Sequence, residues 1–440
     1  MRKAITGVVL TAATVLSISG ASSIAGSTDR FLNWTANDSP TEASIVGGPW
    51  TLAQSGASNA LPSAGYCVNN VRQNNPGTEL MQPYYFPLTT GVGNNLQGYF
   101  DYRPRNITEA IVAATSNDAG KTWSFQRMVL DLSDKCPASD SDTNNDDNGQ
   151  GHPFVMRVQG RNYLYTLDRS ADNIDQSGLV VHQLNPEPEL LLQGVAEFLD
   201  VPQRTTGLLN PDGIIGEIPK AKERLVMYLQ KQKSADNTGD TALPESQQCG
   251  VNPTGRAANH DIVTPRLATT KDGVNFKDLG AVSGLNDSTT VSLTQTRYVG
   301  PRGTIIELPN HRYGLFFSGG NCLDADSDAF HYIGYAESQD LRHWTIVNGI
   351  NNPIASVAPI TVNVNDTPTT IPSNTPVVGE TQSWFAGRVY SPSVTLLNKN
   401  DVTLVFAGYR TAQPSNDLSN YRTIGRVSLK GEYPSFRVRR

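Results

Sequence analysis

Three aspartates stand where short apolar segments begin or end, and carboxylates in such places could carry out acid–base chemistry. Asp212 directly follows Pro211, Asp168 ends an apolar segment that begins at Tyr165, and Asp101 follows Phe100. Cleavage of a glycosidic bond needs two carboxyl groups, one protonated as the acid and one ionised as base or nucleophile. We therefore take Asp212 and Asp168 as the candidate catalytic pair and Asp101 as a third acid that adjusts their pKa values. The alternatives are a turn carboxylate for Asp212 and an ion pair with arginine for Asp168.

Basic and aromatic side chains near these acids could hold a substrate. Guanidinium groups bind both oxygens of a carboxylate or sulfate at once, so converging arginines would favour an acidic glycan. Arginines also join neighbouring sheets, and a lone histidine or tyrosine often has a structural role. The candidate substrate-binding residues are His152, Arg103, Arg169, Arg302, Arg388, Tyr84 and Tyr390.

A recurring X-Pro pair predicts the architecture that would bring these residues together. Each pair opens a short apolar run with the character of a β-strand, and the prolines are Pro83, Pro153, Pro211, Pro301 and Pro392. Repeats of β-units of this size predict an all-β, five-bladed β-propeller of four-stranded antiparallel blades. In a propeller the first strand of every blade starts near the centre, so residues far apart in sequence would share one pocket.

Composition and sequence order predict three parts in the chain. The 440 residues contain 38 Gly and 27 Pro with few long periodic apolar stretches, which argues against a helical protein. Residues 1–26 look like a secretory signal, with Arg2 and Lys3 ahead of an apolar stretch too short for a membrane span. Residues 27–78 are expected to form an exposed leader that packs in part on the propeller, and residues 79–440 the propeller domain. We expect a secreted protein, extracellular or periplasmic.

Four cysteines suit an exported protein with two disulfides. Cys249 and Cys322 fall in corresponding segments of neighbouring units, so we favour that pair and leave Cys67 with Cys136. Free thiols are the alternative. No cysteine spacing indicates a zinc site.

Charge and polar loops limit the partners. A net charge of −6 without a basic cluster gives no footprint for nucleic acid, and no later segment predicts a membrane span. The oxygen-rich stretch from Ser139 to Gln150 allows a calcium site or a solvated loop, and its spacing is not that of an EF-hand. We predict no metal in the catalytic site and no organic cofactor, and we expect a monomer.

A second repeated motif occurs within the same β-units, at a different place from the X-Pro pairs. Ser116, Asp118, Gly120, Thr122 and Trp123 match the Asp-box pattern Ser-x-Asp-x-Gly-x-Thr-Trp at every fixed position. Two degenerate copies end at Phe276 and Trp344. The carboxylate can accept backbone N–H groups of a tight hairpin while the aromatic ring packs into the outer sheet. Asp118, Asp272 and Asp340 are therefore expected to be structural.

These repeats resemble those of known propeller families. The complete Asp box resembles the boxes of sialidases and other BNR-repeat propellers. The segments Gly334–Ser338 and Ser338–Trp344 look more like five-bladed glycosidases of the arabinanase, xylosidase and invertase type. The resemblance implies a five-bladed propeller and hydrolysis of a glycosidic bond in an extracellular glycan.

The sequence also departs from both families. Those glycosidases often carry Asp-Pro at the start of an inner strand, whereas the residues before the five prolines here are not acidic. The early Arg-Ile-Pro signature of sialidases is missing as well. A propeller that binds a glycan without cleaving it, as a lectin does, is therefore the alternative.

Overall fold

The computed structural model describes residues 31–46, 66–68, 71–73, 84–102, 110–130, 150–168, 178–184, 203–220, 222–231, 263–285, 298–320, 332–349, 352–357, 360–364, 367–371, 376–379, 383–386, 388–409 and 422–432. In these residues the chain forms β-strands and two single-turn 3-10 helices, η4 (Pro309–His311) and η5 (Ser383–Phe385). The predicted all-β class is confirmed.

Most described strands fall into five antiparallel groups that follow one another along the chain. Group one is β6 (Tyr84–Val92), β7 (Asn95–Tyr102), β8 (Ala110–Ser116) and β9 (Thr122–Leu130). Group two is β10 (Gln150–Val158), β11 (Arg161–Asp168), β12 (Gly178–Leu184) and β13 (Gln203–Arg204). Group three is β14 (Pro211–Pro219), β15 (Arg224–Lys231), β16 (Val263–Thr270) and β17 (Phe276–Ala281). Group four is β18 (Tyr298–Leu308), β19 (Arg312–Gly320), β20 (Tyr332–Ser338) and β21 (Trp344–Asn348), with β22 (Ala355–Ser356) beside β20. Group five contains β25 (Arg388–Leu396), β26 (Asp401–Tyr409) and β27 (Arg422–Glu432).

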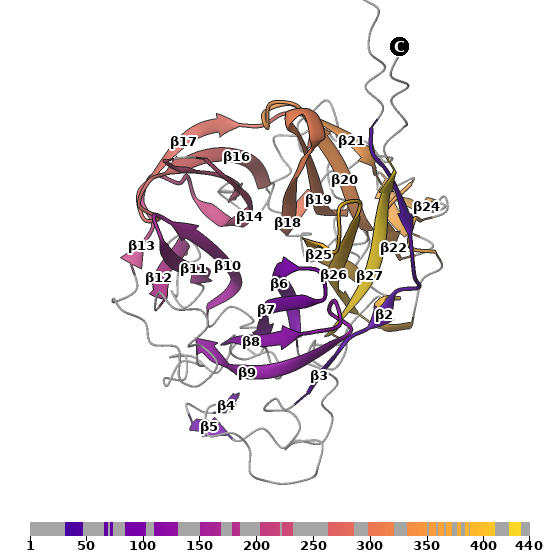
Figure 1. Ribbon diagram of the computed structural model, residues 1–440, viewed down its shortest axis with the longest axis horizontal. Helices are drawn as coiled ribbons and strands as arrows, with labels where there is room; N and C mark the ends of the chain where they lie inside the picture. Colours follow the sequence, from indigo (N-terminus) through magenta and orange to yellow (C-terminus); the bar gives the residue numbers. More distant parts are fainter. Residues whose placement is uncertain are drawn as a thin grey trace, which may run out of the picture.

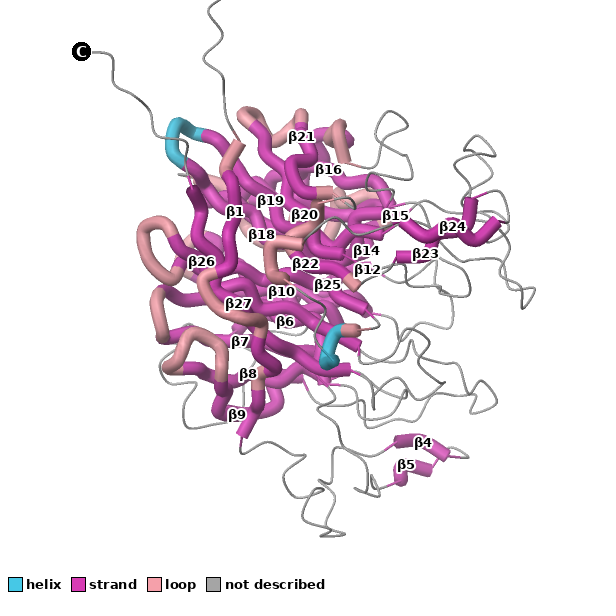
Figure 2. Tube along the Cα trace, turned by 90° about the vertical axis from the view of Figure 1, so that its right-hand side faces the viewer, coloured by secondary structure: helices cyan, strands magenta, loops and turns pink. Residues whose placement is uncertain are grey.

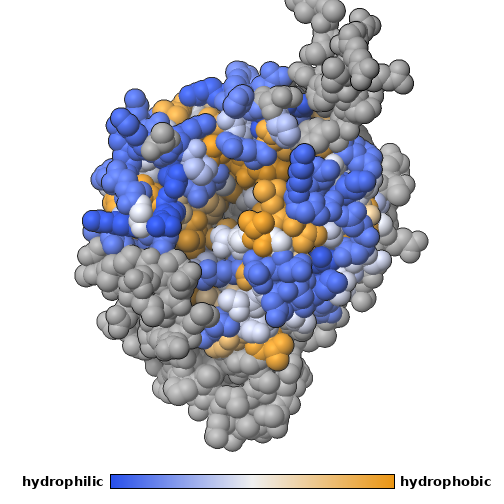
Figure 3. All heavy atoms as spheres, in the orientation of Figure 1, coloured by the Kyte–Doolittle hydropathy of each residue, from blue (hydrophilic) through white to orange (hydrophobic). Residues whose placement is uncertain are grey.

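The groups lie in chain order around a common centre, with the first strand of each group innermost (Figure 1). Each group contacts the next, and β25 of the last group lies beside β6 of the first, where Leu396 pairs with Val92. In the orientation of Figure 1 the centre of the surface is hollowed and its walls are largely hydrophobic, while hydrophilic residues surround it (Figure 3).

Buried side chains fill the spaces between neighbouring groups. Phe154 of β10 and Ile214 of β14 share one core, and Tyr99 of β7 and Leu164 of β11 share another. Groups three, four and five share the largest core, and groups five and one pack together around Trp123. Strands packed on both faces lack polar alternation, as in β20, whose seven residues are all buried. Burial of apolar surface between groups, rather than hydrogen bonding alone, therefore holds them side by side.

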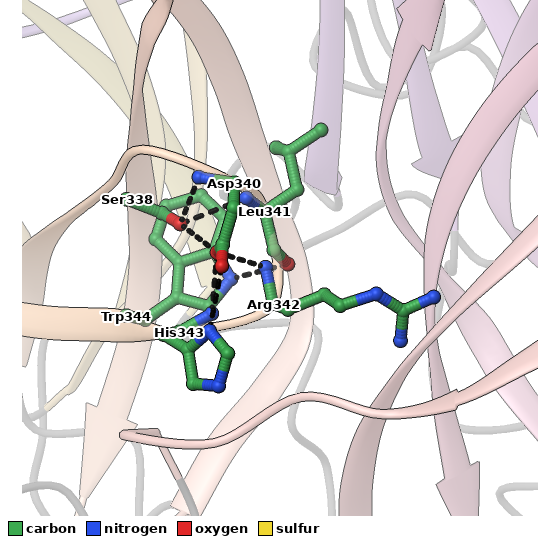
Figure 4. Close-up of polar contacts among 6 residues, drawn as sticks. All are labelled: Ser338, Asp340, Leu341, Arg342, His343 and Trp344. Atoms are coloured by element: carbon green, nitrogen blue, oxygen red, sulfur yellow. Dashed lines mark hydrogen bonds and ion pairs between the residues drawn. The ribbon is translucent and has the colours of Figure 1, made fainter.

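The predicted structural aspartates each fix a tight hairpin between a third and a fourth strand. Asp340 Oδ1 accepts the backbone N–H groups of Arg342 and His343, both at 2.8 Å, while Ser338 Oγ accepts that of Leu341 (Figure 4). The Trp344 indole N–H donates to the Leu341 carbonyl at 3.0 Å and closes the turn.

The other two turns repeat this arrangement. Asp118 accepts the backbone N–H and hydroxyl of Thr122, and Asp272 accepts the backbone N–H groups of Val274 and Asn275. The structural role predicted for these carboxylates is confirmed.

The Asp272 and Asp340 turns also receive the end of a strand from the preceding group. Thr206, just after β13, exchanges backbone hydrogen bonds with Val274 and Phe276, and Ser283, just after β17, does so with Arg342 and Trp344. Glycine follows in both cases, because a Cβ at Gly207 or Gly284 would lie 1.9 Å from the carbonyl oxygen of Phe276 or Trp344.

The N-terminal segment supplies the same junction between the last group and the first. β1 (Asn33–Ala36) and β2 (Thr41–Glu42) pair with the edge of β27, and β3 (Ser44–Val46) pairs in parallel with Thr122–Ser124 of β9. In Figure 1 the indigo segment runs beside yellow β27, and Figure 2 shows β1 along the same strand. Part of the predicted leader is thus built into the sheets: Trp34 is buried and its ring centroid lies 5.0 Å from that of Phe316.

The outer strands of the last and the second unit were expected from the strand pattern. β1 and β2 occupy the edge of β27, and Ser435–Val438, a possible outer strand there, lies outside the described residues and stays a prediction. The outer strand of the second unit, expected near Glu197–Val201, is β13 a few residues later.

The remaining described strands form two separate hairpins, β4 (Tyr66–Val68) with β5 (Val71–Gln73) and β23 (Ile360–Val364) with β24 (Thr367–Ile371). Three of the four cysteines (Cys136, Cys249 and Cys322) lie outside the described residues, so both disulfides remain predictions. Within the described part of the chain, no helix is long and apolar enough to cross a bilayer.

Candidate functional site

The innermost strand of every group bends near its first residues, where the register to the second strand shifts. The bulges lie between Tyr85 and Leu88, Gly151 and Phe154, Pro211 and Gly213, Val299 and Gly303, and Tyr390 and Ser393. Because the first two strands of each group are antiparallel, the end of the second strand lies at the same end of the group. The candidate residues on these strand ends therefore gather at one end of the molecule.

The recurring prolines mark these bulges, with one exception. Pro153, Pro301 and Pro392 lie inside their bulges and Pro211 at the edge of its own. In group one the bulge contains Pro87, whereas the predicted marker Pro83 precedes β6 and lies outside the described residues. Pro83 therefore precedes its strand as predicted, and Pro87 is the proline that occupies the bulge.

In three of the five groups, the residue directly before the proline adopts a left-handed backbone conformation. The φ angles are 57° at His152, 38° at Asn210 and 55° at Ser391. This conformation is costly for a non-glycine residue and persists only where its surroundings enforce it, which is common at functional sites.

Asp101 holds one of these bends. Its side chain is fully buried, and its two oxygens lie 3.0 and 2.9 Å from the backbone nitrogen of His152, whose N–H donates to them. Asp101 is on β7 and His152 on β10, so this carboxylate joins groups one and two. Its position supports a positioning role rather than direct contact with a substrate.

Hydroxyl groups fix the bend in group five. The Ser391 N–H donates to Ser318 Oγ of β19 at 2.6 Å, joining groups four and five. Thr304 of β18 adds a second link, since its Oγ1 accepts the Val394 N–H at 3.0 Å.

Asp212 lies on the bend of group three with its side chain partly exposed. It follows Asn210 and Pro211 and precedes Gly213, whose φ of 143° is available to glycine at low cost. Among the described bends, Asp212 is thus a carboxylate whose side chain is accessible. It lies in the bulge between Pro211 and Gly213, outside the regular strand pairing.

The other candidates are distributed unevenly. Arg388 and Tyr390 lie on β25 beside the Ser391 bend, and both are almost completely buried, with 6% and 3% exposure. The backbones of Tyr84, Asp168 and Arg302 lie at the same end, on β6, β11 and β18, but their side chains lie outside what the structure describes. Arg103 and Arg169 fall outside the described residues, so their roles remain predictions.

The sequence pattern predicts equivalent places for Asp101 and Asp168 at the ends of their strands, but the structure does not place them at equivalent positions. Asp101 pairs with Tyr85, immediately before the bulge of β6, whereas Asp168 pairs with Gln150, one residue farther from the bulge of β10. Leu167 is the residue that corresponds to Asp101. A shift of one residue along a strand moves a side chain to the opposite face of the sheet. Sequence spacing cannot detect such a shift across a bulge.

Glu217 is a further acid near group two, toward the other end of β14. Its Oε2 lies 3.5 Å from Nε of Arg224, which donates to the Arg157 carbonyl of β10. Burial raises the pKa of Glu217 to about 7, against a weaker opposing effect of Arg224. It therefore faces the neighbouring sheet, away from the bend that carries Asp212.

Sequence reasoning missed the hydrogen-bonding groups behind the bends. Ser318 and Thr304 gave no sequence signal, because serine and threonine are common in strands and loops alike. Tyr228, which is fully buried on β15, was also missed: its hydroxyl accepts the Leu209 N–H at 3.2 Å. The proline repeat pointed to the place but not to the partners from other strands.

No group of three or more His, Cys, Asp or Glu among the described residues is arranged to hold a metal ion. The calcium candidates in 139–150 are almost entirely outside those residues, so that hypothesis remains a prediction.

No family model matches the chain, and no curated protein does. Solved structures do show a likeness. A GH43_1 enzyme from Xanthomonas citri complexed with xylose is 14% identical, with 88% of this chain and 94% of that chain covered and a TM-score of 0.46. An alpha-L-arabinofuranosidase from Podospora anserina in complex with cellotriose is 12% identical over 91% and 98%, with a TM-score of 0.48. An N-acetylgalactosamine deacetylase from F. plautii is 10% identical over 84% and 94%, also at 0.48. At these identities and TM-scores, the likeness assigns neither a family nor an activity.

Proposed function

We propose that this chain is a secreted five-bladed β-propeller that binds a glycan where its inner strands begin and hydrolyses a glycosidic bond there. The five strand groups are its blades, and the N-terminal segment closes the ring by completing the last blade. The shared cores and the β25–β6 pairing support closure. Its Asp-box turns join the third and fourth blades to the blades before them, and the first blade to the N-terminal segment.

The observation that carries the proposal is the repeated bend at the inner-strand starts. It gathers Asp212, His152, Arg388 and Tyr390 from three groups at one end of the fold. A carboxylate, an imidazole, a guanidinium and a phenol together can bind sugar hydroxyls and acidic substituents.

In this mechanism Asp212 and Asp168 form the carboxylate pair, one as acid and the other as base or nucleophile. Asp101 takes no direct part, because both its oxygens face the His152 N–H. It fixes the bend that carries His152, whose side chain is 4% exposed.

The test is release of reducing sugar from a panel of neutral, uronic and sialic glycans. We expect release by the wild type and a loss of at least about 100-fold in Asp212→Asn, which keeps the side-chain shape but cannot exchange a proton. Asp401→Asn is the matched control: this acid accepts a hydrogen bond from Asn398 in the turn between β25 and β26, at the opposite end of the strands. Equal activity in Asp212→Asn and wild type would remove Asp212 from the mechanism.

A second function is a glycan-binding propeller without hydrolysis. The full burial of Asp101 favours it, because that acid is withdrawn from any substrate and the described bends retain one partly exposed carboxylate, Asp212. Binding of a glycan by wild-type protein that releases no sugar from it would select this function.

A further inference from the structure

A partly buried chain of hydrogen bonds runs through group three to the segment that carries Asp212. Arg266 of β16 donates through Nε and Nη2 to both oxygens of Asp278 on β17, at 2.9 and 2.6 Å. The Tyr228 hydroxyl of β15 donates to Asp278 Oδ1 at 2.7 Å and accepts the Leu209 N–H at 3.2 Å. Leu209 stands three residues before Asp212.

A second branch of the same network reaches the other side of the bend. Arg266 Nη1 donates to the side-chain oxygen of Gln230 at 3.2 Å, and the backbone of Gln230 pairs with Pro211. Leu209 and Pro211, which flank Asn210, are therefore both bound to β15. The β15 side chains of Tyr228 and Gln230 are in turn hydrogen-bonded to Asp278 and Arg266.

This segment needs such support because its own backbone is strained. Asn210 has a φ of 38° and precedes a proline, and neither condition favours a stable local conformation. Tyr228 is fully buried. Loss of its hydroxyl would remove one hydrogen-bond partner each from the Leu209 N–H and from Asp278, which is costly for buried polar groups.

We propose that Tyr228, oriented by Asp278 and Arg266, is a positioning residue that sets the location of Asp212 at the start of β14. The proposal rests on the proposed glycan hydrolysis. Tyr228 touches no substrate; it acts on the reaction through the backbone of Leu209.

The test compares Tyr228→Phe with Tyr165→Phe. Tyr165 is an equally buried tyrosine, and its hydroxyl donates to the Gly273 carbonyl at 2.7 Å, in the Asp272 turn rather than beside Asp212. Tyr228→Phe loses the hydrogen bonds to Asp278 and from Leu209, Tyr165→Phe loses the hydrogen bond to Gly273, and both variants keep their rings. Thermal unfolding first compares the stability of the two variants. Kinetics are then measured, at a temperature where both are folded, on the glycan that the sugar-release panel identifies.

We expect Tyr228→Phe to lower kcat about tenfold with KM within about twofold, because a displaced catalytic group slows the chemical step more than binding. Hydrogen exchange of a peptide covering residues 207–213 should become faster in this variant. Tyr165→Phe should leave both measurements at their wild-type values. Asp278→Asn, which keeps an oxygen for the Tyr228 hydroxyl, should lose less activity than Asp278→Ala.

Three results would overturn the proposal while leaving glycan hydrolysis in place. They are unchanged exchange in 207–213, unchanged kcat in Tyr228→Phe, or an equal loss of kcat in Tyr165→Phe. A wild-type protein that hydrolyses no glycan would instead refute the proposed function, and the positioning role would fall with it.

Discussion

At the scale of single residues, the acids of this protein have distinct roles set by their surroundings. Asp212 is partly exposed on a bend, Asp101 is buried against a backbone N–H, and Asp340 fixes a hairpin. Glu217 is an acid whose burial is not offset by a close hydrogen bond, since the Arg224 nitrogen is 3.5 Å away. The same functional group therefore acts as a candidate catalyst, an inter-sheet link, a turn device or a source of pH sensitivity.

The raised pKa of Glu217 predicts that the folded protein loses stability as pH rises. Its folded pKa of about 7 lies above the unfolded value of 4.5, so the folded state binds the proton more tightly. That contribution is complete below pH 4.5 and is lost as pH rises through 7, by up to about 3 kcal/mol for a shift of this size. Glu217→Gln should flatten the fall, as measured by urea unfolding at pH 5 and pH 8. An unaltered pH dependence in the variant would contradict this.

The lowered pKa of Asp118 predicts that the folded protein loses stability as pH falls into the acid range. Although partial burial would raise its pKa, hydrogen bonds from Thr122 and Ser116 outweigh that effect and lower it below 3.8. Its stabilising contribution is present above the unfolded pKa and declines as pH falls through the folded one. We expect Asp118→Asn to be less stable than wild type at pH 7, with the difference shrinking at pH 3. A difference of the same size at both pH values would count against this interpretation.

At the scale of elements, each outer strand ends on the aspartate turn of the next group where the structure describes both partners. The N-terminal segment reproduces that junction for the last and first groups. Arg426 of β27 is buried and forms an ion pair with Asp38, whose Oδ1 also accepts the Ser428 N–H at 2.7 Å. Trp34 adds the apolar part of this attachment, with ring contacts to Phe316 and Tyr335.

Trp34→Ala should therefore lower the free energy of unfolding by about 3–5 kcal/mol, the usual cost of removing a buried large aromatic side chain. Phe31→Ala is the control, because Phe31 is 42% exposed and contributes chiefly a ring contact to Arg312. The control should lose less than about 1 kcal/mol in the same chemical denaturation experiment. Equal losses in the two variants would mean that Trp34 does not anchor the segment.

The sequence was informative where the signal was local. Apolar runs, the proline repeat and the Asp118 turn predicted strands, inner-strand starts and hairpins, because each depends on adjacent residues. The one-residue offset between Asp101 and Asp168 and the network behind Leu209 depend on register and on partners from other strands. The place of β1 beside β27 could not be predicted either, since it joins residues almost 400 positions apart.

At the scale of the whole molecule, the N-terminal segment covers the free edge of β27. A chain lacking residues 31–46 would expose that edge and leave Phe316 and Tyr335 without Trp34. Exposed strand edges pair with other chains, so we expect the truncated protein to self-associate while the full chain stays monomeric. Size-exclusion chromatography with light scattering measures both, and a monomeric, stable truncated protein would contradict the closing role.

The central claim is that the bends of the inner strands form one glycan site around Asp212. The most direct measurement is a crystal structure of Asp212→Asn with a glycan that the wild type cleaves or binds. We predict the sugar within hydrogen-bonding distance of residue 212, with His152 or Arg388 contacting a neighbouring hydroxyl or acidic group. A glycan bound elsewhere on the surface, with this end of the strands empty, would contradict the account.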